Sequence, residues 1–450
     1  MLLIPFTVLL FSSLSFAAGG FEKPVLWSAR AAQHGGAYAS AVNGAEALLF
    51  NPAALICEQK KEFHFGISAA SGTTESPIVE NNKTVKTFSG PVTPLGVMYA
   101  QKLDEKQSIG IGIYSIGGLD VGFNKVDLSS QGADFDNYKP DVFGRLSVLE
   151  LGLGYARKIN SNLSLGGTLR QHYASGGFSQ LQVSQAKGLG GFGIPDGTVL
   201  AISKGEFDDL KGYSLGSYLL GAKYLSDDQK TSLALTYRSQ VDFDLKTKGS
   251  GEIVYSASGA AVSGATAGQV NQMTGNQTTI SSSIPEAWTI SGFHKVTQNN
   301  TAHFEYTWTE YSHNKKLAID GKLTNPVDNT TTAVSDVNLN WHDMQDFKFG
   351  WTNTSIESWI FGGGYSVTLP VTNKDYAGPT FAAPGNYQHF YAGLGKAFTN
   401  CRVDAAYEFY FGSHSGKTER LETANTVSPS VKGQHATRAY AFFLSISYFL

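Results

Sequence analysis

The chain has 450 residues, of which 42% are hydrophobic and only 16% are charged, and its formal net charge at pH 7 is −3. The hydrophobic content excludes wholesale disorder, and the near balance of charge gives no basis for nucleic-acid binding. Glycine contributes 50 residues and aromatic residues make up 12%. Abundant glycine and aromatic residues with few charges are typical of a β-barrel whose outer wall faces lipid.

The N-terminus has the pattern of a signal peptide, which we assign to residues 1–17. An apolar run over 2–14 is followed by Ser15 and Ala17, the small residues that a signal peptidase requires. We expect cleavage after Ala17 or Ala18, and therefore export, although no Lys or Arg precedes the run. The alternative is an uncleaved anchor helix, but the run is short for a membrane span.

Residues 18–60 precede the first predicted strand and form a segment of their own. Asn51 is a good helix N-cap, Pro52 suits the first helical position, and Ala53 is a good helix former. A helical segment has no place in a barrel wall, whereas a barrel of fourteen strands encloses more space than side chains alone can fill. We therefore predict that 18–60 is a partly helical plug in the lumen, here called the hatch.

Residues 61–450 carry a strand pattern throughout. Apolar and polar residues alternate over 231–246. This alternating segment is longer than a typical soluble strand of roughly 5–6 residues. A tilted strand needs roughly 9–11 residues to cross a bilayer, so segments of this kind can span one. We predict fourteen strands, at 62–70, 94–101, 107–116, 146–158, 162–179, 212–225, 230–246, 284–296, 301–312, 341–353, 357–367, 386–398, 401–413 and 437–450.

The connections between these strands alternate strictly between short and long. Tight turns are predicted at 102–106, 159–161, 226–229, 297–300, 354–356 and 399–400, and long connections at 71–93, 117–145, 180–211, 247–283, 313–340, 368–385 and 414–436. Short turns on one side and long loops on the other are typical of an outer-membrane barrel. The predicted fold class is therefore all-β: a 14-stranded antiparallel transmembrane β-barrel in an outer membrane of the Gram-negative type, with an N-terminal plug.

Alternation places several basic side chains on the lumen face of the predicted strands. These are Arg170, Lys223, Arg238, Lys348 and Arg402. A carboxylate in an apolar lumen requires a basic partner, and an arginine fork suits it best. The first four are therefore candidate ligand-binding residues. The alternative is that the basic residues pair with the neighbouring acids Glu150, Asp242, Glu305, Asp346 and Asp404.

Other side chains carry weaker signals. Trp288, Trp308, Trp351 and Trp359 fall on outward faces and are predicted to face lipid or its interface. The sequence alone does not decide whether Cys57 and Cys401 form a disulfide. No Cys/His spacing resembles a zinc site, and "GLGGFG" (188–193) lacks the βαβ context of a nucleotide site. We predict no catalytic residue, metal or cofactor, although His172 near Ser164 leaves a lipid hydrolase as the least favoured alternative.

The stretch "HGGAYASAVNGAEALLFNPAAL", residues 34–55, resembles the hatch of the FadL/TodX (OMPP1) family of outer-membrane channels for hydrophobic compounds. The family's Asn-Pro-Ala hallmark is matched by Asn51, Pro52 and Ala53. Stretches 233–243, 284–293 and 364–371 are also similar to the family, so the resemblance spans essentially the whole mature chain. Arg238 lies in the first of these stretches and leads the candidate ligand-binding residues.

The resemblance implies passive uptake of long-chain fatty acids or other hydrophobic compounds by a channel that is not an enzyme. Ligand is expected to bind at extracellular loops and then in a lumen pocket. Phe21 and Trp27 near the mature N-terminus are expected to enter this pocket, and the alternative is that they only pack the plug. Hatch rearrangement is expected to release the ligand sideways into outer-membrane lipid at a kinked third strand. The glycines expected to form this kink are Gly110, Gly112, Gly117 and Gly118.

The expected partners are thus a hydrophobic small molecule and outer-membrane lipid, with no nucleic acid, and the chain is expected to be a monomer. A plugged general porin and a surface adhesin are functions that compete with the transport of hydrophobic compounds. The sequence leaves the identity of the ligand open.

Overall fold

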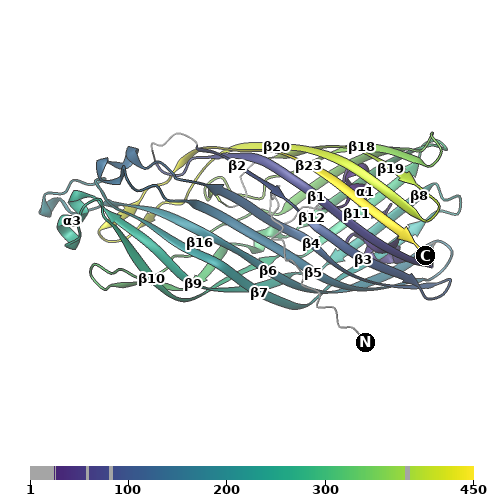
Figure 1. Cartoon of the computed structure of the whole chain (residues 1–450), viewed down its shortest axis with the longest axis horizontal. Helices are drawn as coiled ribbons and strands as arrows, with labels where there is room; N and C mark the ends of the chain where they lie inside the picture. The colour runs from purple at the N-terminus through teal and green to yellow at the C-terminus, as the bar shows by residue number, and fades with distance from the viewer. Residues whose placement is uncertain (1–24, 26, 57–59, 81–84, 381–385) are drawn as a thin grey trace, which may run out of the picture.

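The computed structural model of the chain describes residues 25, 27–56, 60–80, 85–380 and 386–450. The predicted signal peptide, Phe21 and Cys57 lie outside these described residues. The described chain forms one long barrel of tilted strands, with the C-terminus at one end and helix α3 (Ala257–Ser263) at the other (Figure 1).

Fourteen antiparallel strands, some in two parts, close the barrel and confirm the predicted fold class. They are β1 (Lys61–Ser76), β2 (Val85–Val92) with β3 (Leu95–Lys102), β4 (Gln107–Phe123), β5 (Val142–Lys158), β6 (Leu163–Ala186), β7 (Val199–Leu225), β8 (Thr231–Arg238) with β9 (Val241–Tyr255), β10 (Val270–Ile284) with β11 (Ala287–Lys295), β12 (Asn300–Thr309), β17 (Met344–Asn353), β18 (Trp359–Thr368), β19 (Tyr387–Ala397), β20 (Cys401–Lys417) and β23 (Lys432–Phe449). The first strand pairs with the last, from Glu62–Phe449 to Glu75–Ala436, and this pairing closes the cylinder.

The long connections contain more ordered backbone than the sequence predicted. The connection predicted over 71–93 holds the end of β1 and all of β2, which pair from Ala70–Val92 to Ser76–Val85. Short strands lie in two of the other long connections, those predicted over 313–340 and 414–436: β13 (Lys316–Asp320), β14 (Lys322–Thr324), β15 (Thr331–Ala333), β16 (Val337–Asn338), β21 (Leu421–Glu422) and β22 (Thr426–Ser428). Short 3-10 turns also lie in the long connections, at η3 (Ser129–Gln131), η4 (Ala133–Phe135), η5 (Gly190–Phe192) and η6 (Tyr311–His313).

Proline divides two of the strands. Pro94 lies between β2 and β3, and Pro285 lies between β10 and β11. Proline has no backbone N–H group and cannot donate to a neighbouring strand, so it favours an interruption of the ladder. The break at Pro285 is close to Arg238, the last residue of β8, because Arg238 is paired with Ala287.

The hatch consists of short helical pieces: α1 (Ala29–Gln33), η1 (Gly44–Glu46), α2 (Ala47–Phe50) and η2 (Pro52–Leu55). The Asn51 side chain accepts a hydrogen bond from the Ala53 N–H at 3.1 Å, with Pro52 at the first helical position, as the sequence predicted. The preceding helix α2 ends at the same Asn51, whose φ of −163° is extended. Among the described residues, no helix is long and apolar enough to cross a membrane.

Glycines of the inner wall let the hatch lie directly against the strands. A Cβ atom at Gly221 would clash with the Asn51 side chain, and one at Gly350 would clash with the His34 carbonyl. Large hatch side chains such as Trp27 and Leu48 are completely buried. Part of the abundant glycine therefore serves the close approach of hatch and wall.

Candidate functional site

A cavity of about 100 Å³ lies in the lumen against the hatch. Hatch residues Ala39, Leu49 and Phe50 line one side, and Ile116 of β4 and Met344 of β17 add further apolar surface. Among the described lining residues the basic ones are Arg170, Arg238 and Lys348. The cavity therefore brings together three of the four basic residues singled out in the sequence, next to an apolar surface.

Arg170 and Lys348 are both buried in ion pairs. The Nε of Arg170 donates to Glu150 Oε1 at 2.8 Å, and its Nη2 also contacts Glu150. The Nζ of Lys348 donates to Glu305 Oε1 at 2.8 Å and lies 3.4 Å from Asp346 Oδ2. These are pairings that the sequence offered as the alternative to ligand binding, so the protein itself supplies counter-charges for both cations.

Arg238 is half-buried and is held differently. Its Nη2 donates to the carbonyl oxygen of Pro285 at 3.0 Å, at the break between β10 and β11. Arg238 is one of the residues that line the cavity. The planar fork of a guanidinium matches the geometry of a carboxylate.

The acid Glu305 connects the cavity to the hatch. Its Oε1 accepts from Lys348, and its Oε2 accepts from the backbone N–H groups of Tyr38 and Ala39 at 3.0 and 2.8 Å. The Glu305 side chain therefore links Lys348 to the hatch backbone.

The other two lumen cations hold the hatch and do not line the cavity. Lys223 donates to the carbonyl of Val42 at 2.8 Å. Arg402 forms an ion pair with Asp404 at 2.7 Å and donates to Gln33 Oε1 at 3.2 Å. Alternation in the sequence placed both side chains on the inner face, but it did not reveal that the hatch would be their partner.

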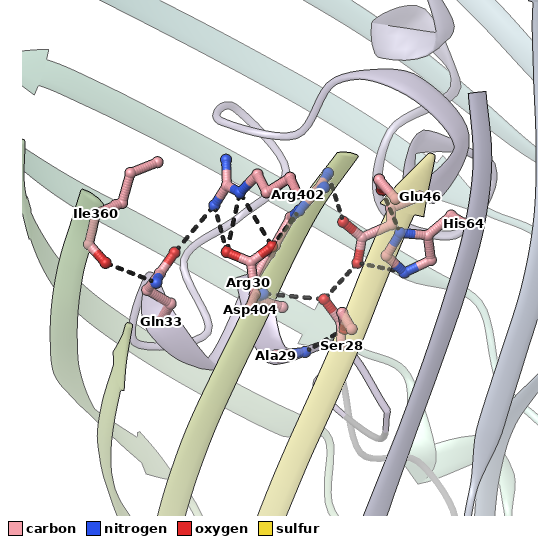
Figure 2. Close-up of polar contacts among 12 residues, drawn as sticks. Ser28, Ala29, Arg30, Gln33, Glu46, His64, Ile360, Arg402 and Asp404 are labelled. Carbon is pink, nitrogen blue, oxygen red and sulfur yellow. Dashed lines mark hydrogen bonds and ion pairs between the residues drawn. The ribbon is translucent and has the colours of Figure 1, made fainter. Parts of the chain in front are cut away.

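A buried charged network around Arg30 fastens the hatch to three strands (Figure 2). Arg30 Nε lies 2.9 Å from Asp404 of β20, and its Nη1 lies 3.5 Å from Glu46 of the hatch and 3.7 Å from Glu62 of β1. The backbone N–H of Ala29 donates to the hydroxyl of Ser445 of β23 at 3.0 Å. This network was not predicted from the sequence. The signal for it was the presence of two charged residues, Arg30 and Glu46, in an apolar, alanine-rich segment.

Glu46 stays ionised in this network. Burial alone would raise the pKa of its carboxyl, but His64, Arg30 and a hydrogen bond from Ser28 at 2.6 Å together hold that pKa below its ordinary value. The negative charge of Glu46, which helps to hold the hatch, is thus stabilised by the neighbouring groups of the same network.

The third strand, β4, carries a bulge between Ser115 and Gly117. On the N-terminal side of the bulge, β4 pairs with β3, from Gly96–Tyr114 to Lys102–Ser108. Within the described part of the chain no ladder pair joins the rest of β4 to β2. We call the part of the barrel wall where residues 85–92 lie beside residues 115–123 the seam, because β2 and β4 are neighbours there and β4 is irregular at the bulge.

The glycines expected at the kink lie in two places. Gly117 and Gly118 adjoin the bulge. A Cβ at Gly110 would approach Leu48 of the hatch at 3.3 Å, and one at Gly112 would do the same. Gly117 and Gly118 therefore lie where the strand is irregular, as expected for a kink. Gly110 and Gly112 instead leave room for the hatch to contact the strand.

Trp27 lies at the end of the seam that begins at Ser115. Its Nε1 donates to the Ser115 carbonyl at 3.0 Å. Its ring lies against β1 and β3, where a Cβ at Gly66 or Gly96 would come within 2.6 Å of the indole. Trp27 is not among the cavity's lining residues, so it packs beside the bulge whose Ile116 does line the cavity.

Removal of the Asn51 cap is expected to loosen the end of the hatch more than the barrel. Asn51→Ala removes the bond to Ala53 and a bond from Asn51 Nδ2 to the Ala39 carbonyl at 3.1 Å, at a local cost of about 0.5–2 kcal/mol. The variant should insert and resist heat like the parent but show more openings to small ions in planar bilayers. Asn43→Ala is the matched control, because Asn43 makes no side-chain cap bond; equal conductance in both variants would contradict the expectation.

The arrangement does not favour catalysis at His172. Its Nε2 lies 3.0 Å from Glu150 Oε2, in the same buried group as Arg170. In the part of the chain that the structure describes, no three His, Cys, Asp or Glu side chains are grouped to hold a metal ion.

Sequence comparisons place these features among known proteins. The sequence model of a family described as outer membrane protein transport protein (OMPP1/FadL/TodX) matches residues 9–449. A long-chain fatty acid transport protein of Escherichia coli O157:H7 is 24% identical over 254 residues, covering 52% of this chain and 54% of that protein. The chain therefore spans about half the length of that relative.

Solved structures share the fold over nearly the whole chain. A FadL homologue of Pseudomonas aeruginosa has a TM-score of 0.72 at 16% identity and covers 96% of this chain and 99% of its own. The toluene transporter TodX of P. putida has a TM-score of 0.68 at 16% identity, with the same coverage. The CymD monoaromatic hydrocarbon channel has a TM-score of 0.62 at 16% identity and covers 97% and 99%. At these identities the likeness establishes the fold alone.

Proposed function

Because the chain belongs to the OMPP1/FadL/TodX family of outer-membrane transport proteins, we propose that it is a channel for the passive uptake of long-chain fatty acids or other hydrophobic compounds. The observation that carries this proposal is the lumen cavity on the hatch, where apolar side chains meet Arg238, Arg170 and Lys348. The names of the similar proteins cover both ligand classes: one is a long-chain fatty acid transport protein, and two are channels for toluene or monoaromatic hydrocarbons. The protein acts as a monomer, without a cofactor and without catalysis.

Ligand enters between the long loops, rests in the cavity and leaves sideways through the seam between β2 and β4. Lateral exit suits an apolar ligand, because a path to the periplasm would return it to water. The cavity reaches the seam through Ile116, the residue within the bulge. Trp27 must move for the seam to open, since it is bonded to Ser115 beside that residue.

Binding in the cavity is coupled to the hatch through Glu305. A ligand carboxylate that attracts Lys348 competes with Glu305, which also holds the N–H groups of Tyr38 and Ala39. An occupied cavity therefore weakens one anchor of the hatch. A general porin has no need for this arrangement, because it works with an open polar lumen.

Arg238→Ala is expected to weaken fatty-acid binding by about 1.5–3 kcal/mol, the scale of a hydrogen bond to a charged group. Arg238→Lys should recover only part of the loss, because the fork is absent. The measurement is a binding titration of a labelled fatty acid with the purified protein. Arg420→Ala is the matched control, since Arg420 is exposed and paired with Glu422 outside the cavity.

Unchanged affinity in a folded Arg238→Ala variant would return Arg238 to a purely structural role. Mass spectrometry of apolar molecules that copurify with the detergent-extracted protein then decides the ligand class. Recovery of hydrocarbons without fatty acids would support the second class, and a protein that neither binds nor takes up either class would contradict the proposed function.

A further inference from the structure

A second, larger cavity lies at the loop end of the barrel. Its volume is about 150 Å³, and it is formed by residues far apart in sequence, from 78–80, 142, 178–183, 336–338, 376–380, 418–421 and 428–431. Apolar side chains supply much of the lining, among them Val79, Phe178, Leu421 and Val431. We call this cavity the outer pocket.

Among the described residues that line the outer pocket, all the charged groups are acidic. Among its described lining residues Glu80, Asp336 and Glu419 are the charged ones, and none is Lys, Arg or His. Glu419 accepts a hydrogen bond from the amide of Asn338 at 2.7 Å, and Glu80 accepts one from the amide of Gln185 at 3.4 Å. These neutral amides position the two carboxylates without offsetting their charge.

Asp336 is the exception, because Lys316 pairs with it at 2.6 Å. The hydrogen bond from Lys316 and one from the Ile319 N–H hold the pKa of Asp336 below its ordinary value, so the Asp336 carboxyl is ionised at neutral pH. The described lining of the outer pocket thus combines carboxylates with apolar surface, whereas the described lining of the inner cavity on the hatch combines Arg170, Arg238 and Lys348 with the acid Glu305.

The size of the outer pocket limits what it can enclose. An enclosed cavity of about 150 Å³ lined by aliphatic and aromatic side chains accepts benzene, and the outer pocket has about the same volume, with polar side chains such as Gln180 and Asn338 in its lining as well. Phe178 lines both the outer pocket and the next cavity inward, an apolar one of about 50 Å³ with Leu210 and Phe243 in its wall. The ring of Phe178 stacks on that of Phe207, with 4.9 Å between the ring centroids.

We propose that the outer pocket binds one uncharged hydrophobic molecule of about the size of a benzene ring and rejects carboxylates. This refines the proposed function, on which it rests for the direction of transport, by assigning the first site on the route to uncharged ligands. A fatty acid passes this site only in its protonated form. Repulsion from Glu80 and Glu419 is the basis of selection, since like charges at close range in a partly dehydrated site weaken binding by about tenfold or more.

Bromobenzene and 4-bromobenzoate test the proposal as a matched pair, because they share the ring and differ in the carboxylate. Crystals of the full chain are soaked at a series of concentrations, and bromine is located by anomalous scattering. Bromobenzene is expected in the outer pocket, and 4-bromobenzoate is expected to need at least about tenfold more for equal occupancy. Absence of bromobenzene from the pocket, or equal occupancy by both probes, would overturn the proposal.

Two sets of variants separate charge from size. Glu80→Gln with Glu419→Gln should admit 4-bromobenzoate, while Glu422→Gln should not, because Glu422 is exposed and outside the pocket. Leu421→Trp should exclude bromobenzene by filling the pocket, while Ala424→Trp, at an exposed position, should leave bromobenzene bound.

Uptake by the unaltered protein is measured separately. Transport with an empty pocket would refute only this site. A filled pocket without transport would refute only the proposed function.

Discussion

Replacing Arg30 with Ala is expected to release the hatch and to raise the single-channel conductance of the barrel. The change leaves Asp404, Glu46 and Glu62 buried without their shared cation, and breaking a buried ion pair by removing one partner costs about 3–5 kcal/mol. The barrel wall has its own hydrogen-bonded ladder, so the cost falls on the docking of the hatch. Planar-bilayer recordings should show frequent openings that the parent lacks.

Arg420→Ala provides the comparison for the loss of one arginine, because Arg420 pairs with Glu422 at the exposed loop end. Arg30→Lys should give an intermediate result, since one ammonium group cannot reach three carboxylates in the manner of a guanidinium. Conductance equal to that of the parent in the folded Ala variant would show that the network does not hold the hatch. If residues 19–58 can be deleted with no change in conductance or fatty-acid uptake, the segment is not a hatch.

Trp27→Ala is expected to open the seam between β2 and β4 and to speed the loss of ligand from the protein into lipid. Removing a fully buried Trp costs about 3–5 kcal/mol, and here it also removes the bond to the Ser115 carbonyl and the ring that covers Gly66 and Gly96. The measurement is the rate at which a preloaded labelled ligand passes from the reconstituted protein into the surrounding bilayer.

Trp341→Ala is the matched control, because Trp341 is equally buried but packs on Tyr311, away from the seam. Trp27→Phe keeps a ring and loses the N–H donor, so its release rate should lie between those of the parent and Trp27→Ala. The same release rate in Trp27→Ala and Trp341→Ala would reduce Trp27 to a packing residue.

The number of strands and their inward faces could be predicted from local pattern. A wall residue points either to lipid or to the lumen, and the period of two follows directly from the geometry of a strand. That period placed Arg170, Lys223, Arg238 and Lys348 on the inner face before any contact was known. The cap at Asn51 and Pro52 was equally local, because a helix start depends on neighbouring backbone groups.

The partners of those residues depended on register and on the hatch. The sequence offered Glu150 and Glu305 as possible counter-ions, but only the paired strands bring them to Arg170 and Lys348. No local pattern relates Arg30 to Asp404, which are 374 residues apart, or Trp27 to Ser115. Such contacts arise when the chain closes into a barrel and the hatch packs against its inner wall.

What the sequence by itself determined is therefore the barrel, the hatch segment and the set of inward-facing charges, since each is encoded within a few residues. What only the tertiary structure decided is which charges line the cavity, which hold the hatch, where the seam lies and that the outer pocket is acidic. The outer pocket shows the reason most clearly: Glu80, Asp336 and Glu419 lie on three separate loops. Their shared effect on a ligand exists only after fourteen strands have brought those loops to one end of the barrel.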